Sequence, residues 1–357
     1  MIAENVTLTS HIEETLPTFL QSHTFSQLGV VVDENTAQHC YPLIQELLPQ
    51  HTVCTIHSGE QHKNLDTCAQ LWEWMTQARF DRQALLINLG GGVIGDMGGF
   101  CAATYKRGLR FLNLPTTLLS QVDASVGGKL GIDFQGYKNH IGLFQEPLQV
   151  IIYPEFLQTL PFQELRSGYA EVIKHSLIAD EKYWPVVRET PINKQNWEAI
   201  IDHSVKIKAN VVAQDFREGG LRKILNFGHT IGHAVESFYL DTDRHLLHGE
   251  AIAVGMIAET FLSEKYTGLP AEQAQQIVEL LINIYGHRSV PEAEMNDIIA
   301  LAQQDKKNIQ SAIQCTLLER IGAATFDVPI EADDIREALS YYNKAAAGYQ
   351  DRYSPSL

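Results

Sequence analysis

The sequence predicts an α/β N-terminal domain with a parallel, Rossmann-like sheet, followed by a mostly α-helical C-terminal domain. Over residues 1–153, short apolar runs alternate with amphipathic stretches, which is typical of strands and helices in a parallel sheet. After Pro161, apolar residues recur with helical spacing instead. We therefore predict an α/β domain at 1–153, with helices on both faces of its sheet, and a mostly helical domain at 154–357. We expect the active site in the cleft between them.

Five strands are predicted in the first domain. Each is a short run rich in apolar or β-branched residues that ends at a turn residue or a charged residue. They are residues 27–32, 52–56, 84–89, 111–114 and 149–153. Residues 64–78 form an amphipathic helix between the second strand and the third.

Six helices are predicted in the second domain, and they are residues 165–179, 197–213, 224–239, 250–266, 270–284 and 333–346. Gly268 and Pro270 separate two of them, because glycine commonly follows the end of a helix and proline is tolerated at its start. Only residues 313–318 look like a strand in this half of the chain.

Composition narrows the class of protein. The 357 residues carry a formal net charge of −16, which argues against nucleic acid or an anionic membrane as a partner, because both are polyanions. The five cysteines include no CxxC pair, which favours reduced thiols. The N-terminus has no signal-peptide pattern, and no apolar run approaches the ~20 residues of a membrane span. We therefore predict a cytoplasmic protein.

A glycine-rich turn follows the third predicted strand. Gly90, Gly92 and Gly95 have the GxGxxG spacing, and a helix-compatible stretch follows them. Glycine lets the backbone approach a phosphate, and a helix N-terminus offers free N–H groups to it. A standard dinucleotide site also has an acid at the end of the next strand, whereas residues 112–115 contain none. The turn therefore predicts either nucleotide binding of a non-standard kind or an ordinary tight turn.

Polar side chains follow the other predicted strands. Asp33 ends the first, residues 58–63 (SGEQHK) follow the second, and Thr116 and Thr117 follow the fourth. Because the carboxyl ends of parallel strands meet at one edge of a sheet, these groups are expected to share a ligand site. Taken singly, each is more simply a solvated turn, an exposed strand end or, for Thr117, a helix cap.

Histidines and a buried acid suggest a metal site. His229 and His233 are four residues apart on one face of a helix, and His248 opens the next helix. Glu171 lies in a largely apolar helix, where a carboxylate requires a cation. Lys174, one turn later, offers an intrahelical ion pair as the alternative. Spacing alone leaves open which of four histidines would be ligands: His229, His233, His245 or His248.

Basic residues recur beside these glycine-rich and histidine-rich turns. In so acidic a chain, their position suggests a pocket for an anion, although scattered solvated charges are the usual outcome for any one of them. They are Lys129, Lys138, Lys174, Lys208, Arg222, Lys306 and Lys307.

Taken together, these segments resemble the 3-dehydroquinate synthase family of the sugar phosphate cyclase superfamily. The most specific blocks are PTTLLSQVDASVGGK at 115–129 and LNFGHTIGHAVE at 225–236. The other blocks follow in the family's order: SGEQHK at 58–63, GGGVIGD at 90–96, YKRG at 105–108, KN at 138–139, FLQTLP at 156–161, SGYAEVIK at 167–174, HGEAIAVG at 248–255 and DKK at 305–307.

The resemblance implies that 1–153 is an NAD-binding domain and that 154–357 is a metal- and substrate-binding domain. It also implies which residues contact the metal, NAD and the substrate. The metal, normally zinc with cobalt as the alternative, would be held by Glu171, His229 and His248, and His233 would contact substrate instead. The implied NAD contacts are Asp33, Ser58, Gly59, Glu60, Gln61, His62, Lys63, Gly92, Val93, Ile94, Gly95, Asp96, Thr116, Thr117, Lys129, Lys138, Phe156, Leu157, Gln158 and Thr159. The implied substrate contacts are Asp123, Lys129, Asn139, Lys174, Lys208, Arg222, Asn226, His233 and one of Lys306 or Lys307.

The resemblance also implies the reaction. The family converts 3-deoxy-D-arabino-heptulosonate 7-phosphate into 3-dehydroquinate and phosphate, a lyase step of the shikimate pathway toward chorismate and the aromatic amino acids. NAD oxidises a secondary hydroxyl, phosphate is eliminated, the hydride returns, and an internal aldol step closes the ring. Arg107 would reach the site of a partner subunit, which implies a homodimer.

Two positions depart from the family pattern. Leu130 and Tyr137 stand where the family often has threonine and glycine, although Lys129, Lys138 and Asn139 keep their spacing.

Three other functions are alternatives to this one. They are a cyclase that forms 2-deoxy-scyllo-inosose or 2-epi-5-epi-valiolone, a polyol or glycerol-phosphate dehydrogenase, and a non-catalytic NAD- or metal-sensing regulator. Intact implied metal ligands argue against the regulator.

Overall fold

The computed structural model describes residues 4–135, 137–240, 242–303 and 313–353, with side chains as far as residue 345. The chain separates into two compact units. The first comprises Met1–Gly168 and Asn196–Ala213, and the second comprises Tyr169–Gln195 and Gln214–Leu357. The first unit extends past the boundary predicted at residues 153 and 154 and takes in a later helix, α7 (Trp197–Gln214). The role assigned to each domain stays a prediction.

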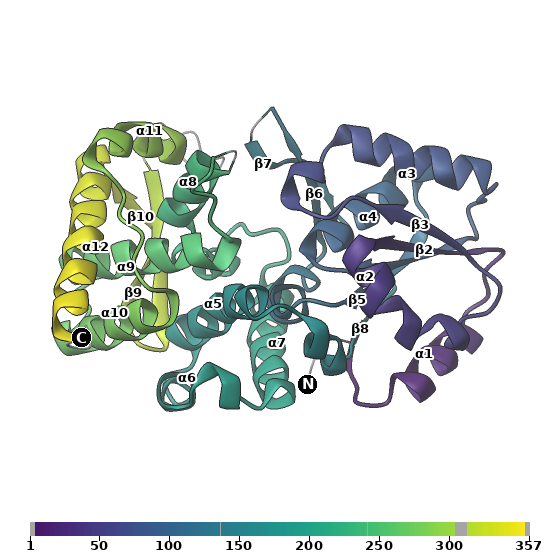
Figure 1. Ribbon diagram of the computed structural model, residues 1–357, viewed down its shortest axis with the longest axis horizontal. Coiled ribbons are helices and arrows are strands. Elements are labelled where there is room, and N and C mark those ends of the chain that lie inside the picture. The colour runs from purple at the N-terminus through teal and green to yellow at the C-terminus, as the bar shows by residue number, and fades with distance from the viewer. Residues whose placement is uncertain (1–3, 136, 241, 304–312, 354–357) are drawn as a thin grey trace. The chain divides into compact units, whose positions relative to one another are not determined.

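The first unit contains a six-stranded parallel sheet (Figure 1). Its strand order is β1-β8-β5-β4-β2-β3, and its strands are β1 (Val6–Leu8), β2 (Leu28–Asp33), β3 (Thr52–Ile56), β4 (Leu85–Gly90), β5 (Arg110–Pro115) and β8 (Gln149–Ile152). The five predicted strands are confirmed. Strand β1 was not predicted, because three residues are too few to display a period of two.

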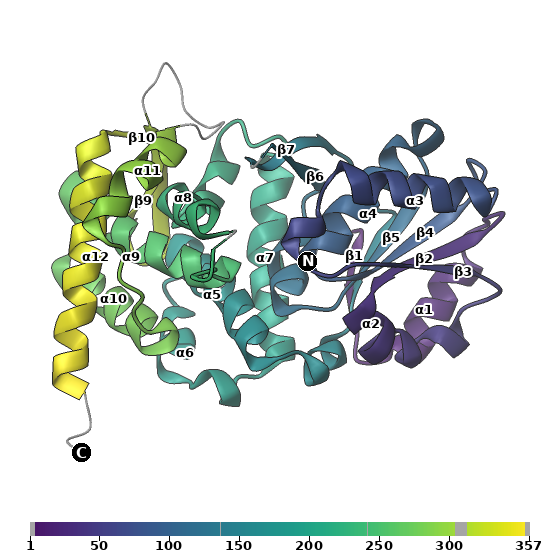
Figure 2. The ribbon, with the colours of Figure 1, turned by 45° about the horizontal axis from the view of Figure 1, so that its top comes forward.

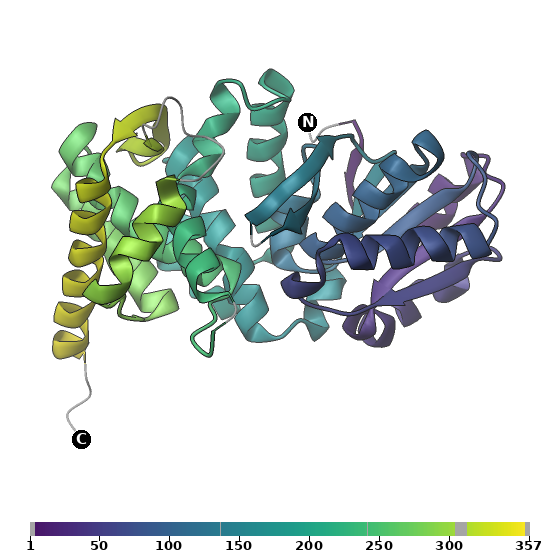
Figure 3. The same ribbon diagram turned by 90° about the horizontal axis from the view of Figure 1, so that it is seen from above.

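Helices cover both faces of this sheet, as predicted. Side chains alternate along a strand, so Val31 of β2 packs with α3 (Leu65–Gln77) and α4 (Gly92–Thr104) on one face. Its neighbour Val30 packs on the other face with α1 (Ile12–Gln21). Figure 3 shows α3 lying along the sheet. One apolar core therefore packs on each face of the sheet, and the carboxyl ends of the strands lie at one common edge.

A second, two-stranded sheet in this unit was not predicted. Strands β6 (Lys129–Phe134) and β7 (Tyr137–Phe144) form an antiparallel hairpin. Leu130 is buried, and a Cβ added to Gly99 of α4 would lie 2.6 Å from its side chain. The departure at Leu130 thus fills a packing position against α4. Tyr137 is exposed at the start of β7.

The second unit is mostly helical, as predicted, but it contains one hairpin (Figure 2). Its elements are most of α5 (Phe162–Ala179), α6 (Trp184–Glu189), α8 (His229–Tyr239), α9 (His248–Tyr266), α10 (Ala271–Tyr285), α11 (Glu292–Gln303), α12 (Ala332–Tyr353), β9 (Ile313–Arg320) and β10 (Ala323–Ile330). The expectation of a single strand here was wrong. Two register shifts and Pro329 interrupt β10 and weaken its alternating pattern.

The predicted helix at 224–239 was also wrong, because the segment is broken in the middle. A 3₁₀ turn at Leu221–Asn226 ends before Phe227, and α8 begins only at His229. Gly228 between them has φ of 80°, a left-handed conformation that a helix interior does not contain. No helix in the described part of the chain is long and apolar enough to cross a membrane.

Candidate active site

Three side chains that are distant in sequence meet in the second unit: Glu171 of α5 and the first residues of α8 and α9, His229 and His248. The Nε2 atoms of His229 and His248 each lie 3.5 Å from Oε1 of Glu171. Glu171 is fully buried and His229 is 8% exposed. Any carboxylate in such an environment requires a cation. We call these three residues the metal centre.

The spacing of the metal centre fits a divalent metal ion. Ligand atoms about 2.0–2.1 Å from zinc at tetrahedral angles are about 3.4 Å apart. The two 3.5 Å separations from Glu171 Oε1 agree with this value. One carboxylate and two imidazoles form a three-ligand set, which leaves a fourth position for a reacting oxygen. The chemistry of the donors and their spacing therefore both fit zinc.

The other nitrogen of each imidazole is held by a buried partner. Nδ1 of His229 lies 3.0 Å from the carbonyl oxygen of Phe227, and Nδ1 of His248 lies 3.3 Å from Oε2 of Glu236. An Nδ1–H donated to such a partner turns Nε2 toward the centre, which is the arrangement of metal-binding histidines. Glu236 was not predicted as a site residue. It lies seven residues after His229, so helical spacing would have placed it on the same face.

The charge around His248 favours a cation. Burial lowers the pKa of His248, but the carboxylates of Glu236 and Glu171 raise it more, to about 9. At neutral pH the imidazole therefore carries both protons when no metal is bound. A metal ion bound here would take the place of the Nε2 proton, and the same two carboxylates would attract it.

Lys174 completes the surroundings of Glu171. It is 1% exposed and forms an ion pair with Oε2 of Glu171, while the histidines face Oε1. The two sequence alternatives, an intrahelical ion pair and a metal ligand, are therefore compatible. Oε2 of Glu171 pairs with Lys174, and Oε1 faces the two histidines.

Glycines bring α8 and α9 close together. A Cβ on Gly255 would lie only 1.9 Å from the carbonyl oxygen of Gly228 and 2.7 Å from the backbone nitrogen of Gly232. Real side chains do not approach backbone this closely, so α9 requires glycine here. The close contact lets the first residues of both helices, His229 and His248, converge.

The remaining histidines differ in position. The ring of His233 is half-buried, with its centroid 4.9 Å from that of His229 and 5.9 Å from that of His248. Together with Glu236 and His248 it forms a second group of donor atoms that approach one another. Nδ1 of the exposed His245 lies 3.2 Å from the carbonyl oxygen of Leu240, and His245 is in no potential metal group among the described residues.

Two predicted substrate contacts lie just before α8. Arg222 is 1% exposed, and its guanidinium donates to the carbonyl oxygen of Phe216 at 2.6 Å. Asn226 donates to Oε1 of Glu218 at 3.0 Å. Lys306 and Lys307, the other predicted contacts in this half, lie outside the described residues.

In the first unit, the predicted nucleotide groups gather at the carboxyl edge of the sheet. Gly90 pairs with Pro115 in the register of β4 and β5, and a Cβ on Gly91 would lie 3.1 Å from the side chain of Thr117. A Cβ on Gly90 would strike Ile94 at 2.4 Å, so this turn requires glycine. The glycine turn and the threonine turn are therefore neighbours.

Several of these groups also have local structural roles. The side chain of Thr117 accepts from the backbone N–H of Ser120 at 3.2 Å, as the helix-cap alternative predicts. The carboxylate of Asp33 accepts from the backbone N–H of Thr36 at 2.7 Å and caps α2 (Glu34–His39). These two side chains fix the start of helical segments at the sheet edge.

Lys63 is buried and bonds two other predicted residues, Asp96 and Asn139. We call these three residues the strand-end cluster. Lys63 Nζ lies 2.6 Å from Oδ2 of Asp96 and 2.6 Å from Oδ1 of Asn139. Burial lowers the pKa of Lys63, but Asp96 and Glu60 raise it further, so the ammonium stays charged. Asn139 has φ of 49°, and its backbone N–H donates to Asp133 at 2.7 Å. Asp133 was not predicted.

The other predicted residues of this unit fall into two groups. The side chains of Ile94, Phe156 and Leu157 are buried with the apolar core, so only their backbones can face a ligand. The charged and polar members form pairs at the sheet edge or lie exposed. They include Lys138 with Glu60 at 3.4 Å, Lys208 with Asp123 at 2.8 Å, the backbone N–H of Ser58 with Glu34 at 2.8 Å, Gln158 with Glu155, and the exposed Arg107, Lys129, Gln61 and Thr159.

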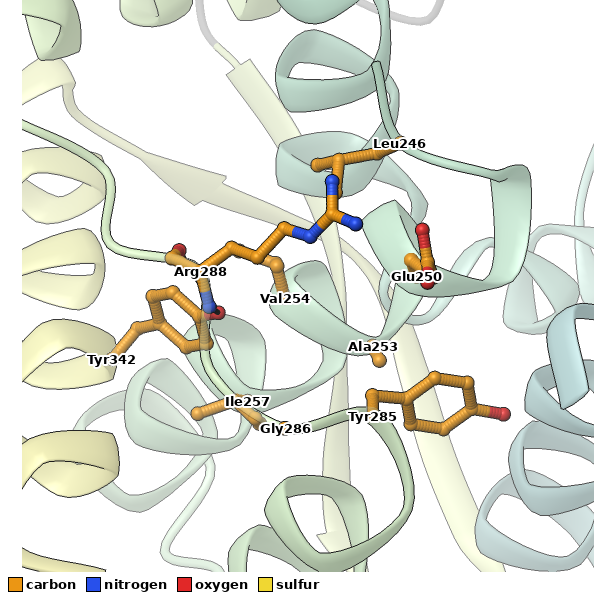
Figure 4. Close-up of a pocket in the computed structure, with 9 residues that line it drawn as sticks. All are labelled: Leu246, Glu250, Ala253, Val254, Ile257, Tyr285, Gly286, Arg288 and Tyr342. Carbon is orange, nitrogen blue, oxygen red and sulfur yellow. Dashed lines mark hydrogen bonds between the residues drawn. The ribbon is translucent and has the colours of Figure 1, made fainter. Parts of the chain in front are cut away.

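A pocket elsewhere in the second unit contains none of the predicted site residues (Figure 4). Mostly apolar side chains of α9, α10 and α12 line it, together with Glu250 and Arg288. The guanidinium of Arg288 donates to the carbonyl oxygen of His245 at 3.0 Å. The pocket therefore shares no lining residue with the metal centre.

Residues 53–167 match the family described as 3-dehydroquinate synthase N-terminal, and residues 168–308 match the family described as 3-dehydroquinate synthase C-terminal. The chain belongs to the 3-dehydroquinate synthase family. It is 37% identical over 350 residues to a 3-dehydroquinate synthase of Parabacteroides distasonis, covering 97% of this chain and 99% of that protein. It is 43% identical over 286 residues to one of Bordetella pertussis, covering 79% of each.

Solved structures with other names share the fold of the 3-dehydroquinate synthase family. One is 2-epi-5-epi-valiolone synthase of Streptomyces hygroscopicus subsp. jinggangensis with NAD⁺ and Zn²⁺ bound, at a TM-score of 0.84 and 22% identity, covering 96% of this chain and 98% of that one. Another is 2-deoxy-scyllo-inosose synthase complexed with carbaglucose-6-phosphate, NAD⁺ and Co²⁺, at a TM-score of 0.80 and 23% identity, covering 94% and 95%. At these identities the likeness concerns the fold alone.

Proposed function

We propose that this protein is a 3-dehydroquinate synthase, which converts 3-deoxy-D-arabino-heptulosonate 7-phosphate into 3-dehydroquinate and phosphate. The observation that carries the proposal is the metal centre: Glu171, His229 and His248 have the spacing of zinc ligands in a chain of this family. The solved relatives named with NAD⁺ and Zn²⁺ or Co²⁺ support the same two cofactors.

In this proposal, Glu171, His229 and His248 would hold the metal. Bound NAD would supply reversible hydride transfer at the carbon that bears a secondary hydroxyl, and the metal would supply a Lewis acid for the oxygen on that carbon. Lys174 balances the second oxygen of Glu171 and, as a buried ammonium, offers a proton donor beside the centre. His233 lies next to both ligand rings and orients the substrate rather than the metal.

The nucleotide is assigned to the carboxyl edge of the sheet. The backbone N–H groups at the start of α4 suit a phosphate, because a helix N-terminus carries partial positive charge. Thr116, Thr117, Asp33 and the 58–63 turn surround this edge of the sheet. Lys63 and Lys138, which pair with Asp96 and Glu60, are further proposed contacts.

Basic residues position the substrate phosphate. Lys129, Lys208, Arg222 and one of Lys306 or Lys307 are the proposed cations, with Asp123, Asn139 and Asn226 as further contacts. Fixed cations stabilise the charge that develops on the leaving phosphate, and they need no reorganisation during the reaction. The location of the site between two domains, and a cytoplasmic location for the protein, stay predictions.

The functional unit is proposed to be a homodimer in which Arg107 reaches the partner's site. Lys106 and Arg107 both have left-handed backbones, with φ of 49° and 71°, and Arg107 is exposed. Such strain in successive residues other than glycine suggests a functional constraint. Mixing inactive R107A with an inactive metal-centre variant tests this, because hybrid dimers would regain part of the activity.

The function is tested by measuring phosphate release from the heptulosonate phosphate with NAD and zinc present, while following absorbance of reduced nicotinamide. Equal amounts of phosphate and dehydroquinate with no accumulation of NADH are expected, since the redox cycle closes. NADH that accumulates with turnover would indicate a dehydrogenase instead. No reaction in a folded, metal-loaded protein would redirect the proposal to the other sugar phosphate cyclases.

A further inference from the structure

A further buried carboxylate, besides Glu171 and Glu236, contacts the helix that carries His229. Glu259 of α9 is fully buried and accepts hydrogen bonds from the backbone N–H groups of Gly228 at 2.5 Å and Ile231 at 3.0 Å. Those groups belong to the N-terminal end of α8. The N-cap of α8 is Gly228, which has no side chain with which to cap the helix. The neighbouring helix therefore supplies the cap.

The capped groups flank a metal ligand. His229 follows Gly228 directly, and Ile231 lies two residues further on. The carboxylate of Glu259 thus accepts hydrogen bonds from backbone N–H groups on both sides of His229. Glu259 also belongs to α9, whose first residue is His248. One helix therefore carries one histidine ligand and fixes the backbone of the other.

Charge gives Glu259 a second effect. A helix N-terminus carries about half a positive charge, which opposes a cation held by the first residue of that helix. At α8 the carboxylate of Glu259 offsets this charge, because it accepts from the free N–H groups that carry it. At α9 the carboxylate of Glu250 accepts from the N–H of Leu247 at 3.1 Å.

We propose that Glu259 is a positioning residue for the metal: it fixes the N-terminal turn of α8 so that Nε2 of His229 faces Glu171, and it offsets the helix charge that would repel the cation. The inference rests on the proposed function for the presence of a metal. The hydrogen bonds themselves do not depend on that function. Because Glu259 occupies the N–H groups of Gly228 and Ile231, these two groups do not bind the substrate phosphate.

The test is Glu259→Gln, which keeps the shape of the side chain but places an amide NH₂ against a backbone N–H. We expect zinc affinity, measured by competition with a chelator well below the unfolding temperature, to fall about 10–100-fold, as for other groups that orient metal ligands. The visible spectrum of the cobalt-loaded variant should change as His229 is displaced. Glu264→Gln is the matched control, since Glu264 is on the same helix and is not among the groups that cap α8.

Each outcome separates the two proposals. A folded Glu259→Gln protein with wild-type zinc affinity and cobalt spectrum would overturn the positioning role and leave the enzyme assignment intact. Wild-type protein that binds no divalent cation would overturn both.

If Glu259→Gln does not fold, hydrogen exchange in the metal-free wild-type protein decides the matter. Slow exchange of the Gly228 and Ile231 amides, together with an intermediate zinc affinity in Glu259→Asp, is expected. Exchange as fast as in exposed loops would contradict the proposal.

Discussion

The metal centre of the second unit and the strand-end cluster of the first unit both gather polar side chains from distant segments, but they hold them differently. At the metal centre, each histidine uses Nδ1 for a buried partner and keeps Nε2 directed at one oxygen of Glu171. In the strand-end cluster, Lys63 bonds both Asp96 and Asn139.

The difference follows from the size of the expected ligand. A metal ion about 2 Å from each ligand requires donor atoms at defined positions, so their partners must fix them in advance. A dinucleotide extends over many residues and is recognised largely by backbone N–H groups and strand ends, so its site needs a rigid edge more than a few aligned atoms. The strand-end cluster makes that edge rigid.

The largest effect is expected from a substitution that removes one ligand of the metal centre. His248→Ala removes a ligand, so zinc content and activity should be lost together, with activity falling by at least about 10³-fold because a metal contributes several kcal/mol to the reaction. Metal analysis and phosphate release measure the two. His233→Ala is the matched variant and should lose activity while it keeps the metal. Metal retained by the first variant, or lost by the second, would reverse the assignment of the histidines.

The strand-end cluster is tested by Lys63→Met. The substitution leaves the half-buried carboxylate of Asp96 without the Lys63 ammonium, which we expect to cost about 1–3 kcal/mol in the free energy of unfolding. Denaturant unfolding measures the loss. In an Asp96→Asn background the same substitution should cost less, since the carboxylate charge is absent. Equal costs in both backgrounds would show that the ion pair does not stabilise this edge.

Substitution of one glycine in each unit compares the metal centre and the strand-end cluster directly. Gly255→Ala inserts a methyl group 1.9 Å from the backbone of Gly228, so unfolding should become easier by about 1–3 kcal/mol, with weaker zinc binding as α8 and α9 separate. Gly95→Ala in α4 meets nothing within 4 Å and should stabilise the protein by about 0.5–1 kcal/mol. Thermal unfolding of both variants measures the contrast. A stabilised Gly255→Ala would contradict the close packing of the two helices.

A pH-dependent effect is expected far from both regions in sequence, at the start of α12. Burial raises the pKa of Asp334, but its bonds to Lys265, the N–H of Glu331 and Tyr266 lower it more, so the net pKa lies below the ordinary value. The stability that the ionised form contributes is present above the unfolded-state pKa of about 3.9 and is lost as pH falls through the lower folded value. Asp334→Asn should cost about 1–2 kcal/mol at neutral pH and less in strong acid. A cost that does not depend on pH would exclude this charge as the cause.

Periodic segments were the most predictable part of the fold. The five central strands and helices such as α9 and α10 have long apolar patterns, and each was placed within one or two residues of its observed ends. Elements that tertiary contacts stabilise were missed. Strand β10 is irregular, the β6–β7 hairpin packs on α4 through Leu130, and the break at Gly228 depends on its contact with α9.

For the site, the sequence by itself determined the residue types and, through family motifs, the implied ligand set of Glu171, His229 and His248. It did not determine the turn that starts α8, since the predicted helix at 224–239 is broken at Gly228. Only the tertiary structure decided which nitrogen of each imidazole faces Glu171. It also decided that the carbonyl of Phe227 and the carboxylate of Glu236 bond the two rings, and that Glu259 bonds the start of α8. The reason is physical: periodicity and spacing are properties of one segment, whereas the direction of a buried hydrogen bond depends on the packing of helices that are distant in the chain.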